Sequence, residues 1–471
     1  MKRKMLVGGE WIESDKYFDL INPYDGQPIA EIPLASGEDV TRAVDSALRG
    51  FKEISTLPPH CRADILLKIS NLLIEKKEKI AQTIAVESGK PLKYSIGEVE
   101  RAVETFRFAS EEAKRIHGET IPMGASKGSE NRVAFYERFP LGVIGAITPF
   151  NFPINLVAHK VAPAIAAGNA IVLKPAEQTP LTALLLGEIL LEAGLPSKAI
   201  QIVTGDGVTG AALVNDDRLK MITFTGSPPV GREIKSKAGM KKVTLELGSN
   251  SGVIIEPDAD IDTAVTRALM GAFANSGQVC ISLQRIYLHR EIYEIFKSRF
   301  VEKVKGLKSG DPMNAGTDIG PLIDRAAADK TGRRVNEAVK EGACILLGGK
   351  GKGSFFEPTV LENVTPSMQV VCGEVFAPLV SLISYDDFDD ALRMVNDSIY
   401  GLQAGVYTKD INKAFKAFRV LEVGGVIIND VPTYRADHMP YGGVKESGLG
   451  REGLKYAVEE MTELKTLVLN L

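Results

Sequence analysis

The sequence predicts an α/β protein built as two lobes, each around a largely parallel sheet. The chain has 471 residues, which exceeds the length at which a single hydrophobic core usually stops growing. Short apolar runs typical of buried strands alternate with segments of helical spacing, the pattern of a parallel sheet covered on both faces. This pattern begins near residue 141 and again near residue 252. We therefore expect a cleft between two lobes, where substrate sites often lie.

The elements follow in order along the chain. A hairpin is expected to turn at Gly8-Gly9, and residues 38–117 have the apolar spacing of several helices in series. The predicted strands of the first lobe are residues 143–147, 170–173, 200–203, 221–224 and 243–247, and those of the second are residues 252–255, 281–288, 345–347, 379–384 and 426–429. Residues 462–471 alternate like a strand without a partner in their own lobe. Because a free strand edge invites pairing, we expect them to pair with residues 118–138 or with another subunit.

Composition and charge exclude several classes of protein. The net charge is −4, so no basic surface for nucleic acid is expected. No apolar tract is long and unbroken enough to span a membrane, and the N-terminus lacks the apolar region of a secretory signal, which predicts a cytoplasmic protein. The four cysteines, Cys61, Cys280, Cys344 and Cys372, have neither metal-ligand nor disulfide spacing, so no metal site is expected.

Cys280 is the first candidate for chemistry. It follows a small, polar turn containing Gly277 and begins an apolar run. A thiol presented at a strand edge suits a nucleophile, which needs access and either a lowered pKa or a nearby base. The alternative interpretation is an ordinary buried cysteine that packs like a small hydrophobic residue.

Two further polar residues stand at the ends of predicted strands. Glu246 ends an apolar run, where an ionised carboxylate is costly unless it is paired or used, and a raised pKa would make it a general base near neutral pH. Asn151 lies in a turn with two prolines after the strand at 143–147, and its amide can donate to an oxyanion. The alternatives are an exposed strand end for Glu246 and an Asx turn for Asn151.

These segments, in this order, resemble the aldehyde dehydrogenase superfamily over essentially the whole chain. The resemblance extends to four further motifs: FTGS at 224–227, KPAEQTP at 174–180, EVFAP at 374–378 and PYGGVKESG at 440–448. Departures from the commoner pattern at Phe150, Ser249 and Asn250 look like the lactaldehyde, sulfolactaldehyde and non-phosphorylating glyceraldehyde-3-phosphate dehydrogenase branches.

The resemblance implies the aldehyde dehydrogenase fold, with two Rossmann-like α/β lobes and a small β flap for oligomerisation. An NAD-binding domain is expected from residues 1–119 and 138–247, a catalytic domain from residues 248–448, and oligomerisation strands from residues 120–137 and 449–471. The family's habit of donating these strands to a neighbour implies a homo-oligomer, either a dimer or a homotetramer.

The resemblance also implies roles for individual residues. Cys280 looks like the catalytic thiol, Asn151 with the Cys280 N–H looks like the oxyanion hole, and Glu246 resembles the base for thioester hydrolysis. The residues implied to bind the cofactor are Ile147, Thr148, Phe150, Lys174, Glu177, Gly207, Phe224, Gly226, Ser227, Leu247, Glu374 and Phe376. Residues 205–210 match GxGxxG, but a lone match is weak, and the resemblance puts the phosphates at the helix start beside Ser227.

Glu177 and Glu246 bear on cofactor and reaction type. A carboxylate at position 177 accepts hydrogen bonds from ribose hydroxyls and repels a 2′-phosphate, so we expect NAD to be preferred over NADP. Relatives that pass the acyl group to coenzyme A lack the glutamate found here at position 246, which favours hydrolysis.

Two arginines bear on the substrate. The resemblance places Arg107 where non-phosphorylating glyceraldehyde-3-phosphate dehydrogenases look to hold the phosphate, and Arg435 on the loop that lines the substrate tunnel. Arginine suits an anionic tail, because it binds phosphate, sulfonate or carboxylate in a bidentate manner. The alternative is that each is a salt-bridge partner. His159 is a further candidate for substrate binding, although a satisfied helix residue is the favoured interpretation.

We therefore expect oxidation of a short anionic aldehyde, such as sulfolactaldehyde, phosphonoacetaldehyde, glyceraldehyde 3-phosphate or succinate semialdehyde, to its carboxylate. Succinate semialdehyde is less favoured, because Ala274 and Val279 stand where relatives with such substrates tend to place another arginine. The alternatives are an uncharged short aldehyde such as lactaldehyde, or a non-catalytic binding protein that keeps the fold.

Overall fold

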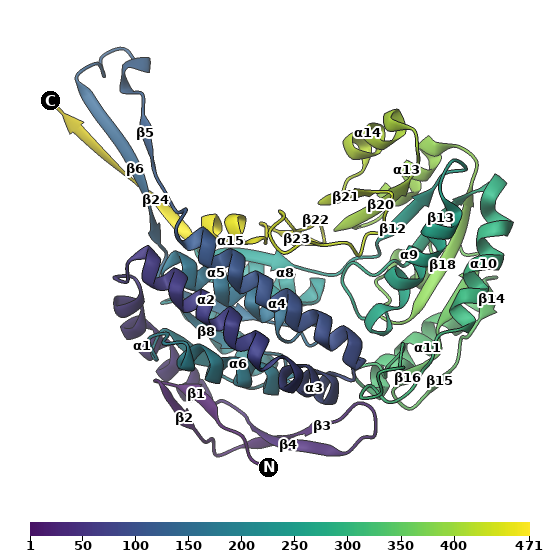
Figure 1. Ribbon diagram of the computed structural model, residues 1–471, viewed down its shortest axis with the longest axis horizontal. Coiled ribbons are helices and arrows are strands. Elements are labelled where there is room, and N and C mark those ends of the chain that lie inside the picture. The colour runs from purple at the N-terminus through teal and green to yellow at the C-terminus, as the bar shows by residue number, and fades with distance from the viewer.

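The computed structural model describes residues 1–471 as two α/β lobes, with a narrow three-stranded sheet projecting from the first lobe (Figure 1). The first lobe is built on an eight-stranded sheet with the order β2-β1-β9-β8-β7-β10-β11-β23. Its strands are β1 (Met5–Val7), β2 (Glu10–Ile12), β7 (Val143–Ile147), β8 (Ala170–Lys174), β9 (Ile200–Ile202), β10 (Met221–Thr225), β11 (Lys242–Glu246) and β23 (Gly448–Leu449). The five strands from β7 to β11 are parallel, which confirms the predicted sheet. The hairpin of β1 and β2 turns at Gly8-Gly9 as predicted.

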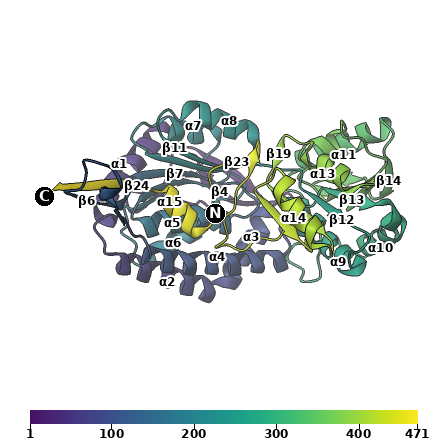
Figure 2. The same ribbon diagram turned by 90° about the horizontal axis from the view of Figure 1, so that it is seen from above.

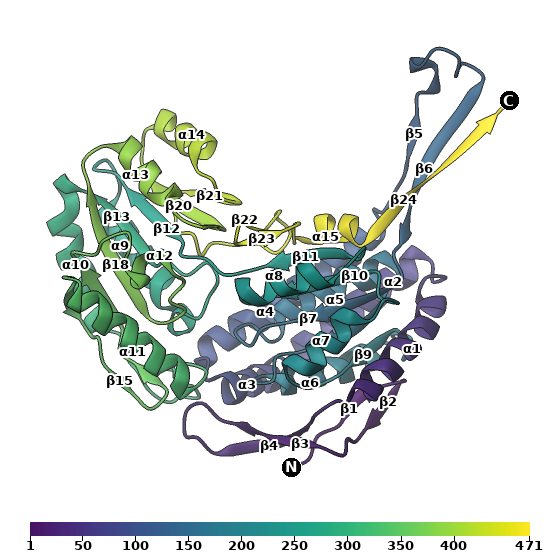
Figure 3. The same cartoon turned by 180° about the vertical axis from the view of Figure 1, so that it is seen from behind.

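Helices cover both faces of this sheet, and every residue of the strands from β7 to β10 is buried, as expected of a parallel sheet. One face is covered by α2 (Pro59–Glu75), α3 (Lys77–Ser88), α4 (Leu92–Ala113), α5 (Asn155–Ala167) and α6 (Pro180–Glu192), which share a core cluster of 44 buried residues (Figure 1). The other face is covered by α1 (Gly37–Ile54), α7 (Gly207–Asn215) and α8 (Pro228–Lys237), as Figure 3 shows from behind. Helices α1 to α4 are the predicted series over 38–117.

The second lobe has a seven-stranded sheet with the order β14-β17-β18-β13-β12-β20-β21, parallel except at β14. Its strands are β12 (Gly252–Ile255), β13 (Arg285–His289), β14 (Cys344–Leu347), β17 (Thr359–Glu362), β18 (Leu379–Tyr385), β20 (Gln403–Tyr407) and β21 (Gly425–Ile428). Its helices are α9 (Ile261–Phe273), α10 (Tyr293–Lys305), α11 (Arg325–Lys340), α12 (Gln369–Cys372), α13 (Phe388–Asn396) and α14 (Ile411–Val420).

One predicted strand of this lobe begins later than expected. Residues 281–284 are a loop, and β13 starts at Arg285. The loop forms because Leu283 donates its N–H to Gly271 at the end of α9, and Gln284 donates to Ser251. The chain after Cys280 is therefore tied to the preceding helix before it enters the sheet.

The projecting sheet contains β5 (Glu119–Ile121), β6 (Arg132–Pro140) and β24 (Thr462–Asn470). Strand β24 pairs antiparallel with β6 over its full length, from Thr462 opposite Pro140 to Asn470 opposite Arg132, which confirms the predicted pairing with residues 118–138. Figure 2 shows this sheet at the end of the first lobe opposite the second lobe. The preceding helix α15 (Leu454–Glu460) packs on α5 instead, so the chain returns to the first lobe before it projects.

The remaining elements are short. They are β3 (Tyr17–Ile21), β4 (Pro28–Pro33), β15 (Gly351–Lys352), β16 (Phe355–Phe356), β19 (Tyr400–Gly401), β22 (Val444–Lys445) and the 3₁₀ turns Met123–Ala125, Ala274–Gly277 and Arg290–Ile292. None of the helices combines the length and the hydropathy that a bilayer span requires.

Strand register brings distant residues of the sequence to one edge of the first sheet. Ile147 lies opposite Lys174 on β8 and Phe224 on β10, and Thr225 lies opposite Glu246 on β11. These residues end parallel strands, so their side chains and the loops that follow them gather at the carboxyl edge of the sheet, where ligands bind in open α/β folds.

Candidate active site

The carboxyl edge of the first sheet opens into a pocket of about 340 Å³ between α7 and α8. Eight residues expected to bind the cofactor line this pocket: Ile147, Thr148, Lys174, Glu177, Gly207, Phe224, Gly226 and Ser227. The Lys174 side chain is buried, which lowers the pKa of its ammonium group, whereas Glu177 is exposed.

Two helices begin at this pocket, and only α8 begins without a side-chain cap on its N-terminal N–H groups. Asp206 caps α7, because its carboxylate accepts from the N–H groups of Val208 and Thr209 at 2.9 and 3.3 Å. Ser227, at the start of α8, makes no such bond with its side chain. An anion is therefore favoured at α8 and opposed at α7 by the capping carboxylate, although two prolines at the start of α8 remove two donors. The GxGxxG match is therefore a helix cap, and the start of α8 is the part of the pocket that suits an anion.

The other expected cofactor residues lie toward the second lobe. The side chains of Phe150 and Phe376 meet edge to face, with ring centroids 5.8 Å apart. The Glu374 carboxylate accepts from the Ser249 N–H at 3.1 Å, and burial raises its pKa to about 7. Leu247 packs under α8, where a Cβ on Gly231 would lie 2.6 Å from it.

The Cys280 loop owes its shape to a run of left-handed backbone after α9. Asn275 and Ser276 have φ of 49° and 55°, and Gly277 follows at 72°. At Gly277 a Cβ would lie 2.1 Å from the Ala377 carbonyl oxygen, so only glycine fits there. The cysteine loop and the segment carrying Glu374 are therefore in backbone contact.

Asn151 is fastened to this loop. Its Nδ2 donates to the Gln278 carbonyl at 3.0 Å, while its buried Oδ1 has no partner. The backbone N–H of Cys280 donates to no acceptor in the chain. Two N–H donors, one on each lobe, therefore lie beside the thiol loop, which is the composition of an oxyanion hole.

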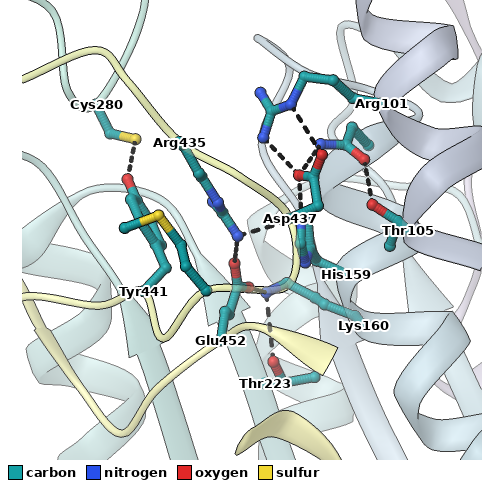
Figure 4. Close-up of polar contacts among 12 residues, drawn as sticks. Arg101, Thr105, His159, Lys160, Thr223, Cys280, Arg435, Asp437, Tyr441 and Glu452 are labelled. Atoms are coloured by element: carbon teal, nitrogen blue, oxygen red, sulfur yellow. Dashed lines mark hydrogen bonds and ion pairs between the residues drawn. The ribbon is translucent and has the colours of Figure 1, made fainter. Parts of the chain in front are cut away.

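The Cys280 residue is half-buried. Its Sγ lies 3.2 Å from the hydroxyl of Tyr441, and burial raises the pKa of the thiol to about 11 (Figure 4). A thiolate is the nucleophilic form of cysteine, so this thiol requires activation.

Glu246 is 3% exposed, and neither of its carboxylate oxygens has a hydrogen-bond partner. Burial is the main cause that raises the pKa of this carboxyl well above its usual value, and the negative charge of Glu452 adds to it. An unpaired buried carboxylate of this kind has a strong tendency to accept a proton.

A buried network of charges lies behind these groups and joins the two lobes (Figure 4). Glu452 accepts from Lys160 of α5 and from Arg435, both at 3.0 Å. Although burial opposes ionisation of Glu452, the two cations hold its pKa down to about 2. Asp437 accepts from Arg101 of α4 at 2.6 Å and contacts His159 at 2.8 Å. The loop after β21 is thereby fixed on α4 and α5.

The two arginines expected to bind substrate have different surroundings. Arg107 is 45% exposed at its side chain and pairs with Glu104 on the same helix. Arg435 is 5% exposed at its side chain, lies over the Tyr441 ring at 3.7 Å and contacts His159 at 3.2 Å, while its buried Nε has no partner. The two arginines share no hydrogen-bond or ion-pair partner. Burial lowers the pKa of His159, which favours the neutral ring.

Four residues of this site were not predicted from the sequence: Tyr441, Asp437, Glu452 and Lys160. Tyr441 lies within the quoted PYGGVKESG motif, and Asp437 is two residues after Arg435, so position near known candidates was the only available signal. No group of three or more His, Cys, Asp or Glu residues is arranged to hold a metal ion.

Comparison with known proteins agrees with this geometry. Residues 11–467 match the family described as "Aldehyde dehydrogenase family", and the chain belongs to that family. It is 51% identical over 468 residues to a 3-sulfolactaldehyde dehydrogenase of Priestia aryabhattai, covering 99% of this chain and 98% of the relative.

Two solved structures have the same fold. Aldehyde dehydrogenase 21 from Physcomitrella patens, in complex with the reaction product succinate, is 43% identical with a TM-score of 0.98, covering 100% of this chain and 98% of the other. An NADP-dependent glyceraldehyde-3-phosphate dehydrogenase from Bacillus halodurans C-125, complexed with NADP, is 39% identical with a TM-score of 0.97, covering 100% of both chains.

The protein is thus an NAD(P)-dependent aldehyde dehydrogenase, an oxidoreductase with the fold of that family. The family and the fold class expected from the sequence are confirmed.

Glu246→Gln is expected to raise the thermal unfolding midpoint, more at pH 8 than at pH 5. Folding raises the pKa of Glu246, so the native state binds that proton more tightly than the unfolded chain does. Above the unfolded value of about 4.3, rising pH therefore favours unfolding until the native pKa is passed, and the neutral amide removes this effect.

Glu452→Gln is the matched control, with the opposite sign. The pKa of Glu452 is lowered by folding, so its contribution to stability is present above about pH 4.3 and is lost as the pH falls toward the native value. Removing one partner of such a buried pair typically costs about 3–5 kcal/mol. An unchanged or lower midpoint for Glu246→Gln at pH 8 would contradict an unpaired carboxylate.

Proposed function

We propose that the protein oxidises a short, anionic aldehyde to its carboxylate through a thioester on Cys280. The observation that supports this most directly is the pair of N–H donors beside the thiol loop, Asn151 Nδ2 and the free amide of Cys280. A catalytic oxyanion hole requires donors already aimed at the position where charge develops.

The chain's own groups supply the following steps. The Cys280 thiolate attacks the aldehyde carbon, and the carbonyl oxygen becomes an anion that accepts from Asn151 and the Cys280 N–H. When NAD(P) is bound, it takes up the hydride that the oxidation releases. Glu246 then removes a proton from water, the resulting hydroxide attacks the thioester carbon, and the C–S bond breaks to release the carboxylate and the thiolate.

Glu246 suits this role because its raised pKa makes it a stronger base than an exposed carboxylate. Its two oxygens have no partner in the chain and so are free to bind water. The presence of this base supports hydrolysis rather than transfer of the acyl group to coenzyme A.

Cys280→Ala is expected to lower aldehyde oxidation by about 10⁴-fold or more, the scale seen when a nucleophile is removed. Glu246→Gln is expected to give a fast burst of NADH close to one equivalent per active site, followed by slow turnover, because the thioester forms but is hydrolysed slowly. Stopped-flow absorbance measures both. Cys344→Ala, at an exposed cysteine, is the control and should behave like the parent enzyme. NADH formation by Cys280→Ala at the parent rate would refute the mechanism.

The proposed substrate is an aldehyde with a sulfonate, phosphonate, phosphate or carboxylate tail. Arg435 supports this proposal, because its Nε is buried without a partner and its charge acts on Cys280. The 3-sulfolactaldehyde dehydrogenase and the succinate complex among similar proteins support an anionic tail as well. We propose Arg107 as a peripheral contact only, since it is largely exposed and pairs with Glu104.

Arg435→Lys is expected to lower kcat/KM for 3-sulfolactaldehyde, glyceraldehyde 3-phosphate and succinate semialdehyde by about 10- to 100-fold, which corresponds to a lost hydrogen bond to a charged group. Lysine keeps a cation for Glu452. The uncharged substrate propanal is the internal control and should lose clearly less than the anionic aldehydes, because a loss that all substrates share reports on the thiol and only the additional loss reports on the anionic tail. Arg107→Met should have a smaller effect on the same anionic aldehydes.

If KM for every anionic aldehyde is unchanged in both arginine variants, the anionic tail is wrong. The second candidate is then an uncharged short aldehyde such as lactaldehyde. One observation favours it: Arg435 is already neutralised by Glu452 at 3.0 Å.

We propose that NAD is preferred over NADP, because the Glu177 carboxylate lines the pocket and would repel a 2′-phosphate. Two basic side chains, those of Lys174 and Lys237, line the same pocket, and Lys237 is paired with Glu233 at 2.6 Å.

The ratio of kcat/KM for NAD to that for NADP is expected to exceed about 10. A tenfold ratio corresponds to the interaction energy that shifts a pKa by about one unit. Glu177→Gln should narrow this ratio through better use of NADP. Gln178→Glu is a matched control that adds a carboxylate and should not improve NADP. Comparable kcat/KM values for the two cofactors in the parent enzyme would contradict the preference.

We also propose a homo-oligomer, a dimer or a tetramer, as the working form. The projecting strand β24 leaves Leu464, Leu467, Val468 and Leu469 between 43% and 52% exposed. A protruding sheet edge with exposed apolar side chains is typical of a surface that another subunit covers.

A further inference from the structure

Tyr441 is the residue whose side chain hydrogen-bonds the Cys280 sulfur. Its ring is 3% exposed, and its hydroxyl lies 3.2 Å from Cys280 Sγ (Figure 4). The hydroxyl makes no other hydrogen bond in the chain. A buried hydroxyl needs a partner, so the thiol is the only group that meets this need.

The direction of this bond depends on the ionisation state of the cysteine. With a neutral thiol, either sulfur or oxygen can carry the shared proton. A thiolate has no proton, so Tyr441 alone can donate. Hydrogen bonds to an ionised acceptor are stronger than those between neutral groups. The contact therefore favours the thiolate over the thiol.

Arg435 strengthens this donor from the ring face. Its guanidinium carbon lies 3.7 Å from the Tyr441 ring centroid, and Glu452 fixes it there. A cation over an aromatic face draws on the electron density of the ring, which makes the phenol a better proton donor. The Arg435 charge also acts directly on the thiol.

The titratable and charged groups that act on Cys280 come from three segments: the loop after β21, the end of β11 and the segment after α12. Arg435 and Tyr441 favour the thiolate, whereas Glu246 at the end of β11 and Glu374 after α12 oppose it. Burial opposes it most strongly. Tyr441 and Arg435 are thus the two neighbours that do most to offset this environment.

We propose that Tyr441 is a further catalytic residue, which stabilises the Cys280 thiolate by donating a hydrogen bond to its sulfur and is held and polarised for that purpose by Arg435. This inference rests on the proposed role of Cys280 as the nucleophile. It gives Arg435 a part in activating the thiol in addition to its proposed contact with the substrate tail.

The test is the pH dependence of Cys280 alkylation by iodoacetamide in the absence of aldehyde, followed by mass spectrometry of the Cys280 peptide. In Tyr441→Phe the rate at neutral pH is expected to fall about tenfold, equivalent to about one pKa unit, and the profile should move to higher pH. Exposed Cys344, measured in the same samples, is the internal control and should be unchanged. Tyr434→Phe is the matched variant, because Tyr434 is 48% exposed in the same loop.

A second measurement varies the donor without removing it. A 3-fluorotyrosine at position 441 is a more acidic phenol, so the alkylation profile should move to lower pH, which a purely structural tyrosine would not cause. The pH profile of kcat/KM should shift in the same directions in both variants.

Equal alkylation rates and an unchanged profile in Tyr441→Phe would overturn the inference, as would equal shifts at Cys280 and Cys344. Neither result bears on the proposed function, which the loss of aldehyde oxidation in Cys280→Ala tests separately. Normal alkylation shifts combined with an active Cys280→Ala would instead leave Tyr441 as a modulator of a thiol that is not the nucleophile, and would refute the catalytic role.

Discussion

The structure of the active site depends on burying several charges between the lobes and pairing nearly all of them. Lys160, Arg435 and Glu452 form one fully buried group, and buried Asp437 forms another with the partly exposed Arg101. A buried charge without a partner costs several kcal/mol, so the partners must stay together. This requirement fixes the loop after β21 on α4 and α5. The same loop carries the residues that reach Cys280 from the second lobe.

Two buried glutamates have pKa values shifted in opposite directions, because only one of them has cationic partners. Glu452 has two cations as partners and stays ionised, whereas Glu246 has none and binds its proton strongly. The two carboxylates are equally buried and close enough for the charge of Glu452 to act on Glu246, so burial alone does not distinguish them. Environments that push two pKa values apart define an acid or base role for one group and a structural role for the other. The cost of leaving Glu246 unpaired is a loss of stability accepted at a functional site.

Much of the fold followed from local patterns. The apolar runs that became β7 to β12 lie within a residue of the predicted strands, because strands buried on both faces leave a clear signature. Strands β17 and β20 were not predicted, since polar residues and glycine interrupt their apolar runs, TVLE and QAGVY. Residues 281–284 were predicted to be part of a strand but form a loop, because Leu283 and Gln284 donate to the carbonyl groups of Gly271 and Ser251. Tertiary hydrogen bonds of that kind leave no trace in periodicity.

The site was predictable in its parts but not in its arrangement. Cys280, Glu246 and Asn151 stood out because each is a reactive or polar residue at the end of an apolar run. The pairing of Arg101 with Asp437 joins residues 336 positions apart, and no spacing rule reports it. The two candidate arginines looked equivalent in sequence, yet one is buried in the network and the other lies on the surface of α4. Burial and partners separate them, and both are properties of the folded chain.

The contact between Gly277 and the Ala377 carbonyl leaves no space for a side chain at position 277. Because the two segments touch through main-chain atoms, no side-chain replacement elsewhere makes room for a larger residue at 277. The backbone that aligns the Cys280 loop with the segment of Glu374 therefore does not tolerate substitution at position 277. Arg107, which lies exposed on α4, is under no such restriction, so it can be exchanged while the backbone around Cys280 stays unaltered.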